Sequence, residues 1–224
     1  GGILASAYAS ALDWSGLWRF AYSHDATGCI DPTKKPITFF DVSGDPLGMA
    51  SDRASICMFI RRDLDVGGQS SIGIDSDRGV LRIVTPRTCG VFAEQGSYAA
   101  GELSVSICKS PATVWVSSLD GEPVSMSSRL LLTHLTDAQN TGARFADASK
   151  RTLLSWGTVP ALMRVGAAEI ALTVSRGDWH VYALSSDGAR KASVGFKENQ
   201  GVITFRASTD CVGESATFAY EIVR

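Results

Sequence analysis

From about Gly67 to the end of the chain, short segments alternate between apolar and polar residues. Leu103, Val105 and Ile107 alternate with small polar residues, which is typical of a strand with one buried face. Turn-forming residues separate such segments at near-regular spacing. The pattern predicts an antiparallel β-sandwich over residues 66–224. The strands are expected at 73–74, 80–85, 102–108, 113–119, 129–135, 169–175, 179–184, 192–196, 202–207 and 217–223.

The stretch from Thr113 to Gly142 holds two of these expected strands, with Asp120-Gly121 and Pro123 between them. Asp-Gly supplies the positive φ that a tight turn needs. The link is longer than a two-residue hairpin. The two strands can therefore either pair with each other or cross from one sheet to the other.

The first 62 residues follow a different pattern. Residues 3–12 place their apolar side chains on one helical face, and Asp45-Pro46 is a typical start for a second helix that ends near residues 61–62. Between the helices, residues 17–22 form a nearly continuous apolar run, which predicts a strand buried on both sides, as in a parallel sheet. Residues 1–65 are therefore expected to form a helix–strand–helix unit, an incomplete part of an α/β architecture.

Composition narrows the function classes. The 224 residues carry a net charge of −2, and no run of Lys or Arg suggests a surface for nucleic acid. No apolar run reaches the length that spans a bilayer, so neither nucleic acid nor membrane is an expected partner. The five cysteines lack metal-binding spacing, and we expect no metal or cofactor; one disulfide among them stays open.

The best candidate chemistry follows the apolar run at 17–22. Trp18 and Tyr22 could stack on sugar rings, and His24 and Asp25 come directly after the run. The carboxyl end of a parallel strand is where α/β proteins place their sites. The simpler interpretation is that the aromatic side chains, Phe20 included, belong to the core.

Three other groups of residues carry weaker signals. His134 and Asp137 lie among many serines, but no Gly-x-Ser-x-Gly motif accompanies them. The aromatic run at 179–182 could be a sugar platform or alternate core packing. The glutamates are scattered, and nothing in the sequence pairs any two as a glycosidase would require; they are Glu94, Glu102, Glu122, Glu169, Glu198, Glu214 and Glu221.

Several motifs together resemble the C-terminal region of large bacterial (β/α)₈-barrel glycoside hydrolases. DWSGLWRFAYSH at 13–24 resembles the last barrel strand, and the helix after Asp45-Pro46 resembles the last barrel helix. The β-sandwich that follows the barrel in these enzymes is matched by VSSLDGEP at 116–123, RLLLT at 129–133, NTG at 140–142, WGTVPAL at 156–162 and FAYEI at 218–222.

The resemblance implies an accessory or structural region of a glycoside hydrolase. In such enzymes the catalytic carboxylates lie on earlier barrel strands, which are absent here, so the chain alone is expected to be inactive. Trp18 or Tyr22 would line a sugar subsite. The implied partners are carbohydrate and the rest of the barrel, in the same polypeptide or another chain. The implied location is secreted or periplasmic.

Two alternatives remain at this point. A free-standing carbohydrate-binding module would expose Trp115, Trp179 or Tyr182 on a sheet face. A complete small hydrolase would place a serine hydroxyl beside His24 or His134.

Overall fold

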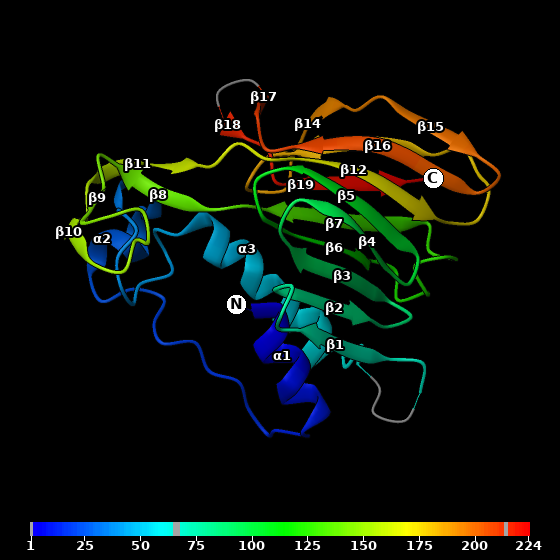
Figure 1. Cartoon of the computed structure of the whole chain (residues 1–224), viewed down its shortest axis with the longest axis horizontal. Coiled ribbons are helices and arrows are strands. Elements are labelled where there is room, and N and C mark those ends of the chain that lie inside the picture. Colours follow the sequence, from blue (N-terminus) through cyan, green and yellow to red (C-terminus); the bar gives the residue numbers. More distant parts are fainter. Residues whose placement is uncertain (1, 65–67, 213–214) are drawn as a thin grey trace.

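The computed structural model describes residues 2–64, 68–212 and 215–224 (Figure 1). Its helices all lie in the first 60 residues: α1 (Gly2–Ala11), α2 (Ala26–Ile30), a 3-10 turn (Pro32–Lys34), α3 (Pro46–Ser55) and a π-helical turn (Ile56–Ile60). The first described strand begins at Ser71. The chain is therefore mainly β, with helices at its N-terminal end.

Two antiparallel sheets form the β part. The larger sheet has eight strands, in the spatial order β1 (Ser71–Asp75), β2 (Val80–Val84), β3 (Thr88–Ala93), β6 (Ala112–Ser118), β7 (Arg129–Leu135), β19 (Ala219–Val223), β13 (His180–Leu184) and β14 (Arg190–Ser193). The smaller sheet has five, in the order β15 (Phe196–Asn199), β16 (Val202–Ser208), β12 (Ala167–Thr173), β5 (Leu103–Lys109) and β4 (Gly96–Ala100).

Three two-stranded ribbons complete the described structure. They are β9 (Arg144–Phe145) with β10 (Leu153–Ser155), β8 (Ala138–Thr141) with β11 (Thr158–Met163), and β17 (Cys211–Val212) with β18 (Ser215–Ala216). The first two extend from the end of β7 toward the loop around α2 (Figure 1). This places both ribbons beside the N-terminal loop.

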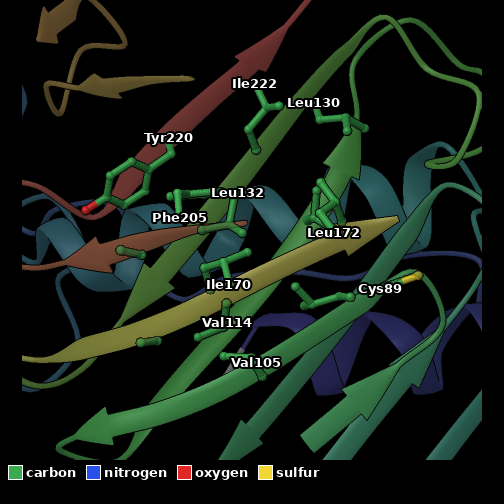
Figure 2. Close-up of a cluster of buried hydrophobic side chains, with 14 of the residues drawn as sticks. Cys89, Val105, Val114, Leu130, Leu132, Ile170, Leu172, Phe205, Tyr220 and Ile222 are labelled. Atoms are coloured by element: carbon green, nitrogen blue, oxygen red, sulfur yellow. The ribbon is translucent and has the colours of Figure 1, made fainter. Parts of the chain in front are cut away.

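A hydrophobic core fills the space between the two sheets (Figure 2). Val114 and Leu132 of the larger sheet meet Ile170 and Val105 of the smaller sheet, and all four side chains are buried. Burial of each such side chain contributes about 1.5–3 kcal/mol. The apolar side chains of the two sheets thus face each other, as expected for the predicted β-sandwich.

A second core covers the opposite face of the larger sheet. Trp115 and Leu135 pack there against Ala7 of α1 and against Leu47 and Met58, which lie in α3 and the turn after it. Neighbouring residues of a strand point to opposite faces, so Val114 enters the first core and Trp115 the second. Strand β6 is consequently buried on both sides.

The second helix starts as the sequence predicts. The Asp45 carboxylate accepts hydrogen bonds from the backbone N–H groups of Leu47 (3.1 Å) and Gly48 (2.9 Å), and Pro46 occupies the first turn. Leu47, Ala50 and Ala54 then point into the second core. The predicted first helix is also confirmed, as α1.

A buried carboxylate joins the end of the helical layer to the sandwich. Asp63 accepts hydrogen bonds from Arg61 Nε (2.8 Å) and Thr88 Oγ1 (2.8 Å), and Arg87 Nε lies 3.0 Å from it. Arg61 Nη1 also donates to the carbonyl of Ser118 at 2.6 Å. The Asp63 carboxylate thus links the chain after the π-helical turn to β3, and its partner Arg61 links it to the end of β6.

The predicted strand at 17–22 is wrong. These residues form no strand, with bends at Phe20 and Tyr22, and their even-numbered side chains face solvent: Trp18 is 91% exposed and Phe20 70%. The Ala21 N–H donates to the Phe40 carbonyl (3.0 Å), and the Val42 N–H donates to the Ala21 carbonyl (3.1 Å). The segment therefore has a backbone neighbour along one edge, while its aromatic side stays uncovered.

No barrel closes in the part of the chain that the structure describes, and the likeness to a (β/α)₈ unit finds no support in this fold. The predicted division into residues 1–65 and 66–224 falls on residues outside the described ones and stays a prediction.

The strand expected at 192–196 straddles β14 and β15, which belong to different sheets. The open question about 113–142 is answered, since β6 and β7 pair in one sheet with Thr113 opposite Leu135.

Replacing Asp63 with alanine is expected to destabilise the fold by about 3–5 kcal/mol, because two partly buried guanidinium groups lose their shared counter-charge. Urea unfolding of D63A measures the change. The matched control is D77A, which removes an exposed carboxylate in the β1–β2 turn and should change stability by less than about 0.5 kcal/mol. Equal stability of the two variants would show that Asp63 does not join the layers.

Candidate functional site

The N-terminal residues expose a group of aromatic side chains. We call Trp18, Phe20, Tyr22, Phe39 and Phe40 the aromatic face; all five are exposed, Phe39 to 75%. The Phe40 ring lies edge-on to Phe20 (5.8 Å between centroids) and to Phe39 (4.7 Å). Contiguous exposed apolar surface of this kind marks a site of interaction.

An oriented imidazole lies among these rings. His24 Nδ1 is paired with the carboxylate of Asp41, and the His24 backbone N–H donates to the same carboxylate at 3.2 Å. The Asp41 side chain is only 4% exposed, whereas half of the His24 side chain is open to solvent. The imidazole centroid is 5.2 Å from that of Phe20. Since Nδ1 is engaged, Nε2 is the ring nitrogen available to a ligand.

Lys35 joins two carboxylates beneath that imidazole. Its ammonium lies 2.8 Å from Asp41 and also pairs with Asp25, and the lysine side chain is only 11% exposed. The hydrogen bonds from Lys35 and His24 hold the pKa of Asp41 well below its usual range. Lys35 and the Gly28 N–H likewise lower the pKa of Asp25, so both carboxylates are ionised at neutral pH.

Of the four predicted site residues, the structure links His24 to Asp25 through Asp41 and Lys35. Asp25 also caps α2 by accepting from the Gly28 N–H at 2.8 Å, so part of its role is structural. Tyr22 shares the exposed side of residues 17–22 with Trp18. Sequence reasoning missed Lys35, Phe39, Phe40 and Asp41, although the run Phe39-Phe40-Asp41 soon after Pro36 carries the same mixture of aromatic and acidic residues.

Trp18 also lines a groove of about 410 Å³ between residues 17–22 and the helical layer. Asp52, which is held by Arg19 at 3.1 Å, is the one carboxyl group in its lining. Burial raises the pKa of Asp52. A glycosidase needs two carboxyl groups across the scissile bond, and this groove supplies one.

The other sequence candidates do not form a catalytic site. His134 is buried, and neither ring nitrogen has a hydrogen-bond partner; Asp137 instead pairs with Lys150 (2.8 Å) and Arg164 (3.0 Å). Among the described hydrogen bonds, no serine hydroxyl reaches His24 or His134. The serine-hydrolase alternative therefore lacks its nucleophile.

The predicted aromatic platforms on the sheet faces are mostly buried. Trp115 belongs to the second core and Trp179 to the first. Tyr182 is partly exposed and lies beneath the guanidinium of Arg190, 4.1 Å from the ring centroid. The module alternative thus loses two of its three expected sugar contacts.

The chain matches no family model, no curated protein and no solved structure. Within the described residues, no group of three or more His, Cys, Asp or Glu side chains could hold a metal ion. No described helix is long and apolar enough to cross a membrane. Cys29, Cys57, Cys89 and Cys108 are free thiols.

Burial lowers the pKa of His134 to about 4, against 6.5 for a free imidazole. Between pH 6.5 and 4 this imidazole is protonated in the unfolded chain but neutral in the folded chain. The free energy of unfolding therefore falls as the pH drops from 6.5 toward 4. In His134→Leu, the fall in the free energy of unfolding between pH 7 and 4.5 should be smaller by about 2 kcal/mol. Urea unfolding at the two pH values measures it.

The matched control for this prediction is His180→Leu, which changes an exposed histidine on β13 and leaves the buried imidazole of His134 in place, so the fall in stability between pH 7 and 4.5 should remain. If His134→Leu also kept the wild-type dependence of stability on pH, the buried imidazole would not be the cause of that dependence.

Proposed function

We propose that this chain is the C-terminal accessory region of a glycoside hydrolase, and that its sandwich stabilises an adjoining catalytic barrel. The observation that carries the proposal is the aromatic face. Residues 17–22 have the composition of a buried strand, yet Trp18 and Phe20 face solvent. Covering them with the missing part of a barrel would remove this apolar surface from water.

The pairing along one edge of the segment supports this arrangement. Ala21 bonds to Phe40 and Val42, and the Ser43 N–H donates to the Tyr22 carbonyl at 2.9 Å, so the two stretches run in the same direction. Parallel neighbours are what a barrel strand requires. The opposite edge of residues 17–22 would receive the preceding barrel strands, from the same polypeptide or another chain.

Carbohydrate is the substrate class that this chemistry fits. Aromatic faces stack on the apolar faces of sugar rings, and His24 Nε2 can accept a hydrogen bond from a hydroxyl group. Trp18 and Tyr22 would supply stacking surfaces. Lys35 and Asp41 hold the imidazole in place, and Asp25 supports Lys35.

The same geometry argues that this chain does not perform the hydrolysis by itself. A glycosidase needs one protonated carboxyl group as general acid. Asp25 and Asp41 share a lysine that keeps both ionised. Asp52 has a raised pKa but is the one carboxyl group of its groove, so at least one carboxyl group of the catalytic pair would come from the rest of the barrel.

A carbohydrate-binding module remains the second candidate, favoured by the exposure of Phe39 and Phe40 next to His24. The two proposals differ in what the aromatic face contacts: an adjoining barrel together with sugar in the first, and sugar alone in the second. Sugar titrations of the chain alone separate them, since a module retains saturable binding without any partner.

The chain alone is expected to self-associate through the aromatic face, because exposed apolar surface is buried when two copies meet. Trp18→Ser together with Phe20→Ser should shift sedimentation toward the monomer and reduce binding of a hydrophobic dye. The control is Leu119→Ser, an exposed leucine at the end of β6. A wild-type chain that stays monomeric and binds no dye would remove the main support for a protein-covered face.

The chain alone should also show no turnover of aryl glycosides between pH 4 and 8. An assay with a panel of fluorogenic glycosides tests this expectation, with Asp25→Asn, Asp41→Asn and Asp52→Asn as the informative variants. Turnover by the wild type that any one of these substitutions abolishes would contradict the accessory role.

A further inference from the structure

A second hollow lies between the N-terminal loop and the two ribbons that extend from β7. It encloses about 260 Å³. Its walls are mainly apolar: Phe39 from the loop, with Phe145, Leu153 and Trp156 from the ribbon residues. The indole of Trp156 is 42% exposed, so a ligand in the hollow can reach it.

A buried amide holds the parts of this hollow together. Asn140, on β8, donates to the carbonyls of Ile37 and Trp156, at 2.8 Å each, and accepts from the Ile37 N–H at 2.7 Å. Its side chain thereby joins three segments that are distant in sequence. The walls are held in place without a ligand, which reduces the entropy lost on binding.

The charges at the rim are uneven. Lys150 is already engaged, since its ammonium bonds to Asp137 (2.8 Å) and Gln139 (3.2 Å). Arg151 also lines the hollow, and its guanidinium has no ion pair or hydrogen bond within the described part of the chain. No carboxylate lines the hollow. It therefore presents one uncompensated cation beside an aromatic wall.

We propose that this hollow binds a single sugar ring that carries a carboxylate, that is, a uronic-acid residue. The apolar face of the ring would lie on Trp156, since the Lys150 ammonium already lies over the Phe145 ring, 5.6 Å from its centroid. The carboxylate would meet Arg151, whose planar guanidinium matches a carboxylate with two parallel hydrogen bonds. The volume is below that of pockets for drug-sized ligands, about 300–1,000 Å³, so one ring fits rather than several. The proposal does not depend on the glycoside hydrolase assignment.

The test is a titration of the whole chain with methyl β-D-glucuronide, followed by calorimetry and by the fluorescence of its five tryptophans, with Trp156→Ala identifying the part of the signal that comes from Trp156. Methyl β-D-glucoside is the neutral probe and benzoate the aromatic acid. The glucuronide should bind at least about tenfold more tightly than the glucoside, since a charge-assisted hydrogen bond is involved. Benzoate should bind more weakly than the glucuronide.

Three variants locate the binding. Arg151→Gln should abolish the preference for the glucuronide, Arg151→Lys should keep part of it, and Trp156→Ala should weaken both sugars. Arg78→Gln, which changes an exposed arginine in the β1–β2 turn, is the matched control. Thermal unfolding confirms that each variant is folded.

Several outcomes would overturn the proposal. They are equal binding of the two glycosides, tighter binding of benzoate, no saturable binding of the glucuronide, and an unchanged preference in Arg151→Gln.

Discussion

The burial of β6 on both faces is the constraint on which the rest of this structure depends. Val114 and Val116 point toward the smaller sheet, while Trp115 between them points toward the helices. Gly90 lies opposite Trp115 on β3, and a Cβ atom there would come within 2.6 Å of the Trp115 Cβ, so the close approach of these strands requires glycine. The N-terminal helices are therefore part of the core, and Asp63 and Arg61 together join their end to the same two strands.

This packing decides which aromatic side chains are free for function. Trp115 and Trp179 are used by the two cores. Most of the exposed aromatic residues lie in the N-terminal loop, where Phe20 and Phe40 flank the imidazole of His24. The proposed sugar contacts and the proposed protein contact thus both lie on the segment that has no strand neighbour on one side.

The sequence predicted most of the regular structure. Two-residue alternation located β5, because Leu103, Val105 and Ile107 are buried while the residues between them are exposed or partly exposed. The Asp45-Pro46 signal located α3, because capping depends only on local contacts. The apolar run at 17–22 gave a wrong prediction of a buried strand, since burial depends on neighbouring segments that the local sequence does not reveal. Lys35 and Asp41 were missed for the same reason, because loop folding alone brings them to His24 and Asp25.

We propose that the aromatic face packs against a catalytic barrel. The most direct measurement is to isolate the native species that contains this sequence from its source, determine its mass and peptide sequence, and assay it for glycosidase activity. The account predicts a polypeptide or complex larger by roughly the 250 residues of a (β/α)₈ barrel, active on glycosides. A native species of 23.8 kDa that is monomeric and lacks glycosidase activity would contradict it.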